Sequence, residues 1–151
     1  MAAAEPPPDC NGPEYRQFDF WIGKFEVRTP DGKIAGHNVI EPTLHGCALT
    51  EHWTGTSGSE GRSINFYDRH EQRWHQVWID AQGEVLRLAG GISDGSMLLE
   101  GTAPGEDGGI LRHRIRWTPL PDGSVRQHWE SSTDGGAHWT TLFDGNYRRE
   151  P

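Results

Sequence analysis

The sequence predicts one all-β domain, a single up-and-down antiparallel β-barrel of about ten strands with little helix. Three observations favour this fold class. Turn signals of the Asp-Gly type recur at short intervals along the 151 residues. The segments between the turns are short, rich in β-branched and aromatic residues, and alternate with a period of two. No segment carries an apolar stripe at helical spacing.

The turns divide the chain into ten segments with strand character. Pro30-Asp31-Gly32 and Pro121-Asp122-Gly123 are typical of the separating turns. The predicted strands cover residues 18–28, 34–42, 46–55, 62–68, 73–80, 85–90, 95–102, 110–118, 124–132 and 137–148. Many short strands leave two open edges unless the sheet closes or doubles. We therefore expect a closed barrel, with a two-sheet sandwich as the second architecture.

The first residues of the chain differ from the rest in composition. Residues 1–15 are rich in Pro and predict a flexible leader, and residues 16–151 form the barrel domain. The start has no basic region followed by an apolar stretch, so we expect a cytoplasmic protein, or an exported one if a longer leader has been removed. Cys10 and Cys47 are the only cysteines. Two unpaired thiols are the favoured interpretation, and a disulfide that ties the leader to the domain is the alternative.

The composition excludes several classes of partner. The chain has 22 acidic and 14 basic residues, a formal charge of −8, so it lacks the basic surface that nucleic acids and anionic membranes require. No run approaches the 18 apolar residues of a transmembrane helix.

Hydrophobic residues make up only 33% of the chain, yet it has seven Trp. A barrel with a cavity explains this combination, because its interior need not be filled by aliphatic side chains.

The alternation of side chains assigns an inner face to most strands. On 110–118, three arginines share one face, and burying them would require three partners, so the opposite face with His113 must be internal. The same argument places Gln127 and Trp129 inside on 124–132.

Two strands need a further argument. On 73–80, two Trp on one face favour that face as internal. On 62–68, periodicity alone favours Ile64 and Phe66, but we place Asn65 and Tyr67 inside because the neighbouring strands also present Trp with uncharged polar groups. The predicted interior comprises Trp21, Phe25, Asn38, Glu51, Trp53, Asn65, Tyr67, Gln76, Trp78, His113, Gln127, Trp129 and Ser131.

Aromatic walls with a few convergent amides, hydroxyls and one carboxylate are typical of a small-molecule site. The predicted ligand-binding residues are Trp53, Asn65, Tyr67, Gln76, Trp78, His113, Gln127 and Trp129. The alternative is that the Trp side chains simply fill the barrel while the amides pair with one another.

The segment Phe18-Asp19-Phe20-Trp21-Ile22-Gly23-Lys24-Phe25 resembles the opening of a bacterial family of uncharacterised FDFWIG-motif domains. The likeness continues through Gly46-Cys47, Glu51, Trp53 and the segments 61–68, 74–80, 125–130 and 143–148. The opening is also similar to the first strand of calycins, the barrel group of lipocalins, fatty-acid-binding proteins and nitrobindin-type haem barrels. This resemblance implies a ligand-binding antiparallel barrel and no settled activity.

We therefore expect the barrel to bind a small hydrophobic or aromatic ligand without a cofactor or a metal, since the eight His include no H-x-H or HExxH pattern. The alternative is a cofactor-independent isomerase, cyclase or hydrolase with Glu51 as general acid/base, because burial between Leu49 and Trp53 would raise the pKa of its carboxyl. A minor alternative is haem binding through His113. The sequence leaves open a homodimer.

Overall fold

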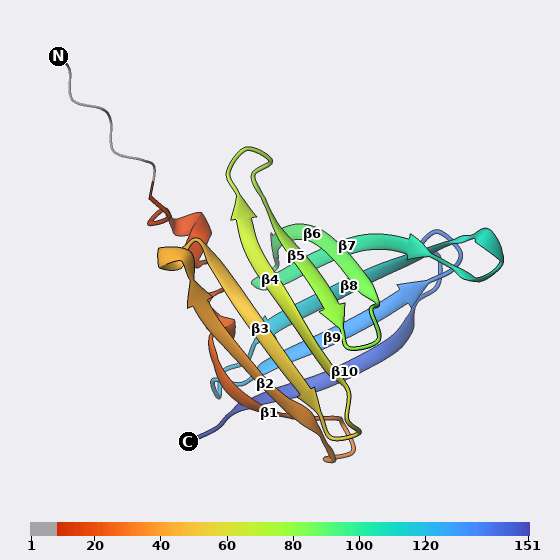
Figure 1. Cartoon of the computed structure of the whole chain (residues 1–151), viewed down its shortest axis with the longest axis horizontal. Coiled ribbons are helices and arrows are strands. Elements are labelled where there is room, and N and C mark those ends of the chain that lie inside the picture. Colours follow the sequence, from red (N-terminus) through yellow and green to blue (C-terminus); the bar gives the residue numbers. More distant parts are fainter. Residues whose placement is uncertain (1–8) are drawn as a thin grey trace.

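Ten antiparallel strands close into a barrel in the computed structural model, which describes residues 9–151 (Figure 1). Each strand pairs with the next along the chain, and β1 pairs with β10 to close the sheet. The strands are β1 (Gly23–Arg28), β2 (Ile34–Thr43), β3 (Ala48–Gly55), β4 (Glu60–Asp68), β5 (Arg73–Asp80), β6 (Val85–Ser93), β7 (Ser96–Pro104), β8 (Ile110–Pro119), β9 (Val125–Ser132) and β10 (Thr140–Arg149). The predicted up-and-down barrel is confirmed, and the sandwich is wrong.

Helical structure in the described part of the chain is limited to short 3₁₀ segments. They are η1 (Pro13–Arg16), η2 (Asp19–Trp21), η3 (Leu44–Gly46) and η4 (Glu106–Gly108). Across residues 9–151, no helix has the length and apolar character needed to cross a membrane.

The first predicted strand, 18–28, is wrong over its first residues. Its start forms η2, and β1 begins only at Gly23, whose φ of 150° is one that L side chains rarely adopt. Phe18 and Trp21 are fully buried, with ring centroids 4.7 Å apart. Both rings also pack on Trp117, at 5.2 and 5.4 Å. These aromatic residues fill one end of the barrel, which we call the closed end.

The expectation of two unpaired thiols is also wrong, because Cys10 and Cys47 form a disulfide. Arg16 supports the same connection by donating to the carbonyls of Cys10, at 3.1 Å, and Gly46. The part of the predicted leader from residue 9 to 15 is thus attached to the barrel just before β3. The rest of that leader, 1–8, lies outside the described residues.

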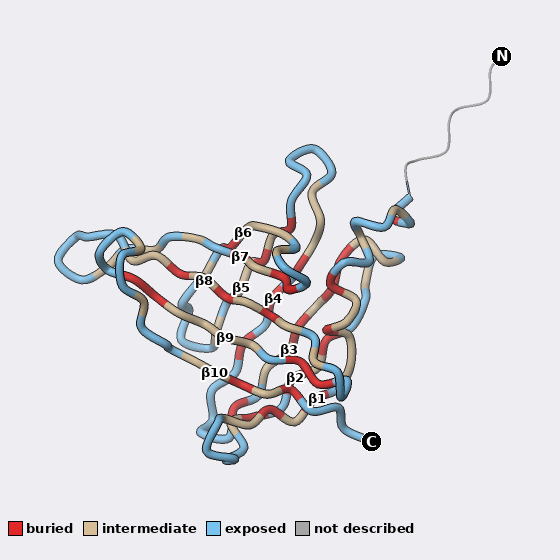
Figure 2. The backbone as a smooth tube through the Cα atoms, turned by 180° about the vertical axis from the view of Figure 1, so that it is seen from behind, coloured by how far each residue is buried: buried red, intermediate tan, exposed pale blue. Residues whose placement is uncertain are grey.

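The inner faces agree with the sequence prediction. All thirteen residues predicted for the interior are buried or half-buried. The strand 62–68 is the sharpest case, because Asn65 is fully buried whereas Ile64 is 38% exposed. Figure 2 shows buried positions alternating with more accessible ones along the strands. The arginines of β8 face outward, where Arg114 pairs with Glu130 at 2.9 Å.

Two further predicted strands begin too early. The strand predicted at 46–55 starts at Ala48, after η3. The strand predicted at 137–148 starts at Thr140, because Asp134 accepts from the His138 backbone N–H at 2.9 Å and holds the preceding residues in a turn. A register shift then interrupts β10 between Thr141 and Phe143.

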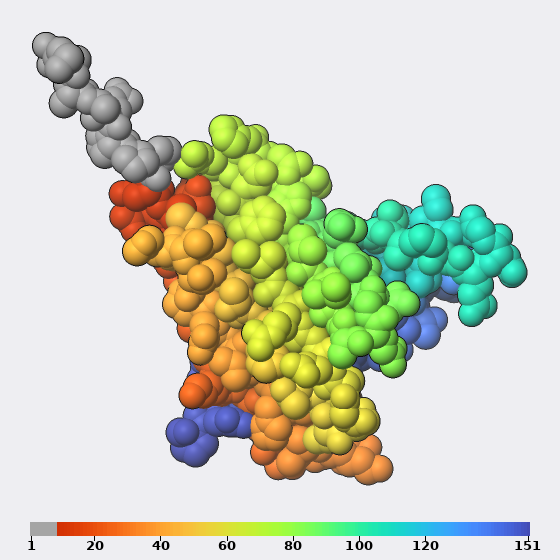
Figure 3. Space-filling model, in the orientation of Figure 1, coloured from red at the N-terminus to blue at the C-terminus, as the bar shows by residue number. Residues whose placement is uncertain are grey.

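The two ends of the barrel differ. The closed end holds the aromatic core around Phe18, Trp21 and Trp74, at the starts of the odd-numbered strands. At the other end, which we call the open end, the odd-numbered strands finish. The β7–β8 hairpin belongs to this end, and its tip stands away from the body of the molecule (Figure 3).

Candidate functional site

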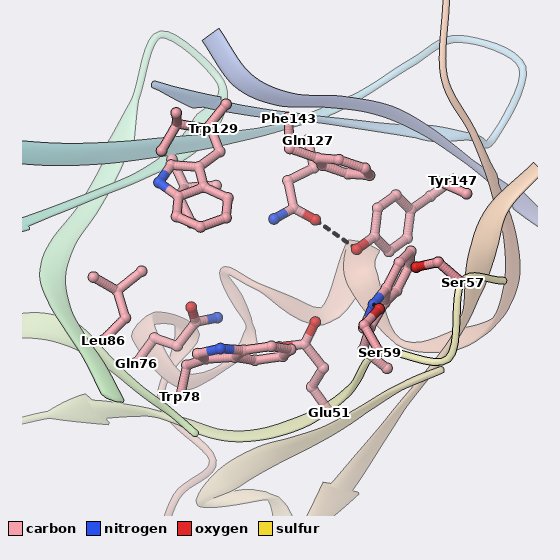
Figure 4. Close-up of a pocket in the computed structure, with 14 residues that line it drawn as sticks. Glu51, Ser57, Ser59, Gln76, Trp78, Leu86, Gln127, Trp129, Phe143 and Tyr147 are labelled. Atoms are coloured by element: carbon pink, nitrogen blue, oxygen red, sulfur yellow. Dashed lines mark hydrogen bonds between the residues drawn. The ribbon is translucent and has the colours of Figure 1, made fainter. Parts of the chain in front are cut away.

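A cavity of about 340 Å³ enters the barrel from the open end. Its walls combine aromatic rings with a few polar groups, and side chains from several strands point into it (Figure 4). The lining residues are Ala35, Glu51, Trp53, Ser57, Ser59, Gln76, Trp78, Leu86, Ile115, Gln127, Trp129, Leu142, Phe143 and Tyr147.

Two glycines make room for two of the Trp walls. A Cβ on Gly61 would lie 2.1 Å from the Trp78 ring, and a Cβ on Gly36 would lie 2.7 Å from the Trp53 ring. Both distances are far shorter than any van der Waals contact, so each indole occupies the space that a side chain would need. The absence of a side chain at these positions therefore sets how the indoles line the cavity.

A chain of hydrogen bonds, which we call the polar belt, crosses the interior beside the cavity. It comprises Gln76, Asn65, Ser63, Glu51, Asn38, Tyr147 and Gln127. On one arm, Gln76 Nε2 donates to Asn65 Oδ1 at 2.8 Å, and Asn65 Nδ2 donates to Ser63 Oγ at 2.9 Å. Ser63 Oγ then donates to Glu51 Oε1 at 2.6 Å.

The second arm of the polar belt reaches Glu51 from the other side. Asn38 Nδ2 donates to Glu51 Oε2 at 2.7 Å and to the Tyr147 hydroxyl at 2.9 Å. The Tyr147 hydroxyl donates to Gln127 Oε1, the contact drawn in Figure 4. Each oxygen of the Glu51 carboxyl thus accepts one hydrogen bond. The belt links side chains of six strands, β5, β4, β3 and β2 on one side of β1 and β10 and β9 on the other.

Glu51 is the electrostatic centre of this arrangement. Its side chain is 6% exposed and forms no ion pair with the described residues. Burial raises the pKa of Glu51, and the hydrogen bonds from Ser63 and Asn38 offset part of that rise. Burial and the nearby Glu51 charge raise the pKa of Tyr147 well above its ordinary value. Glu51 is therefore a desolvated carboxyl at the cavity wall with dipoles around it but no positive charge.

The structure brings most of the predicted site residues together. Trp53, Gln76, Trp78, Gln127 and Trp129 line the cavity, as does Glu51. Asn65 is fully buried and does not line the cavity, but it is hydrogen-bonded to Gln76 and, through Ser63, to Glu51, which both do.

Two predicted residues lie away from the cavity wall. Tyr67 lies towards the closed end, where its ring centroid is 5.3 Å from that of Tyr15 and 6.3 Å from that of Trp74. His113 lies beside Trp129, whose Nε1 donates to His113 Nδ1 at 3.0 Å. Burial lowers the pKa of His113 and so favours a neutral ring. Because Nδ1 accepts from Trp129, the proton of that ring lies on Nε2.

Sequence reasoning missed several lining residues. Tyr147 shares the inner face of β10 with Phe143, and the register shift between Thr141 and Phe143 leaves their spacing intact, so alternation along 143–147 could have indicated Tyr147. Ser57 and Ser59 lie in the β3–β4 turn, where no periodicity indicates a direction. Leu86 faces Trp78 across the β5–β6 pair, a relationship that depends on strand register.

One group of potential metal ligands lies elsewhere in residues 9–151, at the β4–β5 turn. It consists of Asp68, Glu71 and His75. These groups already have partners, since Asp68 accepts from two backbone N–H groups of the turn and Glu71 contacts His75. These contacts stabilise the turn, and they explain, without invoking a metal ion, why the three side chains lie together.

The sequence matches no protein-family model, and a search of curated proteins finds no similar sequence. The structure therefore establishes a ten-stranded antiparallel barrel, and these two comparisons assign it to no family. The resemblance to FDFWIG-motif domains and to calycins stays a prediction.

Proposed function

We propose that the protein binds a small organic molecule in the cavity at the open end of the barrel. The observation that carries this proposal is the contrast between the two ends. The closed end is filled by packed aromatic rings, whereas the open end keeps a cavity of about 340 Å³ whose aromatic walls surround a carboxyl and two amides. Cavities of this size and composition are typical of small-molecule sites.

Unused hydrogen-bonding groups in the cavity wall support the same proposal. Gln76 uses its Nε2 in the polar belt, and its Oε1 has no hydrogen-bond partner among residues 9–151. Gln127 uses its Oε1, and its Nε2 has no such partner. The polar groups of the interior thus do not simply satisfy one another, because the two ends of the belt leave one acceptor and one donor for a ligand or water.

The proposed ligand is small and partly aromatic. Trp53, Trp78 and Trp129 offer flat apolar surfaces, and a volume of about 340 Å³ accommodates a molecule of one or two rings. A ligand-binding role also agrees with the resemblance of the sequence to calycins.

A second candidate function, catalysis without a cofactor, is favoured by one observation. Glu51 is a buried carboxyl with a raised pKa that borders the cavity, as expected of a general acid or base. In a binding protein, replacing Glu51 by Gln changes only the affinity for the ligand, whereas in an enzyme of this type it abolishes turnover. Haem binding through His113 has no comparable support, because the residue does not line the cavity and its Nδ1 accepts from Trp129, which places the proton on Nε2 and leaves that nitrogen no lone pair for iron.

Titration with prodan, a neutral dye whose emission shifts to the blue in apolar sites, tests the proposed function. We expect saturable binding of one dye per chain. Leu86→Trp replaces a small aliphatic side chain in the cavity wall by an indole that takes up space in the cavity, and it should weaken binding at least tenfold. Val85→Trp is the matched control, because Val85 is the adjacent residue, is 41% exposed and does not line the cavity. Binding that is absent in the wild type, or equal in both variants, would contradict the proposal.

A further inference from the structure

We propose that the ligand of this cavity is an organic cation, a protonated amine or a quaternary ammonium whose charged group lies between Glu51 and the indole walls. This inference rests on the proposed function and specifies its ligand class.

The charges of the cavity wall are the first argument. Glu51 contributes a carboxyl, and the lining residues include no Lys, Arg or His. A buried carboxylate without a positive partner is costly, so a positive ligand would be stabilised there more than a neutral one. An anionic ligand would meet Glu51 with no compensating charge. The cavity therefore favours a positively charged ligand over a neutral one and disfavours an anion.

The polar belt is the second argument. Ser63 donates to one oxygen of Glu51 and Asn38 donates to the other, an arrangement that suits the ionised carboxylate. These dipoles hold the carboxylate in one orientation but supply no charge. Each oxygen retains acceptor capacity for an ammonium N–H, and Gln76 Oε1 offers another acceptor on the same side of the cavity as Glu51 (Figure 4).

The aromatic walls are the third argument. The face of an indole attracts a cation, and the attraction grows when the pair is removed from water. Trp53, Trp78 and Trp129 all border the cavity. Elsewhere in the molecule such faces take cations of the chain itself, as where the Arg114 guanidinium lies 3.8 Å from the ring centroid of Trp139. Along the cavity wall, no cation of residues 9–151 occupies that position.

Displacement of bound prodan by three ligands of the same size tests this inference. At pH 7.5 benzylamine is a cation, benzyl alcohol is neutral and benzoate is an anion, and all three carry one phenyl ring. We expect benzylamine to displace the dye at a concentration at least tenfold lower than benzyl alcohol, and benzoate to be the weakest. Equal displacement by benzylamine and benzyl alcohol would overturn the inference and leave the proposed function standing, whereas a wild type that does not bind prodan would overturn both.

Two variants assign the preference to Glu51. Glu51→Gln should lose the preference for benzylamine over benzyl alcohol, measured as the ratio of their displacing concentrations in the same variant. Glu60→Gln is the matched control, because Glu60 is an exposed carboxyl on the neighbouring strand that pairs with His52 outside the cavity. A preference that survives in Glu51→Gln, or disappears in Glu60→Gln, would contradict the assignment. The ligand series in the wild type decides the inference even if Glu51→Gln does not fold.

Discussion

Glu51 and Tyr147, nearly a hundred residues apart in the sequence, share a single amide donor. Asn38 Nδ2 lies 2.7 Å from Glu51 Oε2 and 2.9 Å from the Tyr147 hydroxyl oxygen. Asn38 is fully buried and does not line the cavity, yet it positions two residues that do. The central claim, a small-molecule cavity with a buried carboxyl, depends on this arrangement.

Removal of the shared donor should destabilise the protein. In Asn38→Leu, the Glu51 carboxyl and the Tyr147 hydroxyl each lose a hydrogen bond inside the barrel, and we expect the free energy of unfolding to fall by about 3 kcal/mol. Urea unfolding measures this change. Asn146→Ala is the control, because Asn146 is half-buried and donates to Ser124 at 3.2 Å outside the polar belt. A loss as small as that of the control would show that the shared amide contributes little.

The stability of Glu51→Gln relative to the wild type should increase with pH. Burial raises the pKa of Glu51 in the folded protein above its ordinary value of 4.5. Between those two pKa values the unfolded chain has released this proton and the folded protein has kept it. Wild-type stability therefore falls in that interval by about 1.4 kcal/mol per pH unit relative to the variant, which has no carboxyl at this position.

Urea unfolding of both proteins at pH 4, 6 and 8 checks this dependence, since other titrating groups cancel in the difference. The free energy of unfolding of Glu51→Gln minus that of the wild type should be lowest at pH 4 and higher at pH 6 and pH 8. A difference that does not change with pH, or that changes in the opposite direction, would show that the carboxyl has no raised pKa.

A methyl group at Gly61 should distort the cavity. A Cβ there would lie 2.1 Å from the Trp78 ring, so Gly61→Ala forces the indole to move and should cost about 2 kcal/mol of stability. It should also weaken prodan binding. Gly91→Ala is a matched control on β6, where an added Cβ meets nothing within 4 Å. If both variants behave like the wild type, Gly61 does not position Trp78.

The disulfide should matter for stability and not for the cavity. Cys47 precedes β3 and the turn containing Ser57 and Ser59 follows it, so the disulfide and the cavity lie at opposite ends of that strand. Replacing both Cys10 and Cys47 by Ser should lower the free energy of unfolding by about 4 kcal/mol in the chain-entropy model. At a temperature where the variant is folded, prodan should bind with unchanged affinity. Weaker binding by the folded variant would contradict this separation.

Much of the fold could be predicted because the turns and the alternation are local signals. The errors fall where tertiary packing decides. Phe18 and Trp21 have the composition of a strand, but they fill the closed end of the barrel from outside the sheet. Likewise, spacing alone cannot show that Cys10 and Cys47 come together, because their approach depends on where η1 and η3 pack.

For the candidate site, the sequence predicts whether a side chain faces into the barrel, but not how far along the barrel axis it lies. Alternation shows which side chains face inward, as it does for His113 and Trp129, because arginines on the opposite faces cannot be buried cheaply. It does not show at which height in the barrel a side chain lies. Tyr67 and Trp78 both face inward, yet Tyr67 packs near the closed end and Trp78 lines the cavity, since that height depends on the register between strands.

The seven Trp allow the most direct test of the cavity as a binding site. In a ¹⁵N-labelled sample each indole Nε1–H gives one NMR signal, and benzylamine added at millimolar concentration should shift those of Trp53, Trp78 and Trp129, which line the cavity. The signals of Trp21, Trp74 and Trp117 in the aromatic core, and of Trp139 outside the barrel, should stay in place. Saturable shifts confined to the three cavity residues would support the account. Shifts confined to the other four, or no shifts at all, would contradict it.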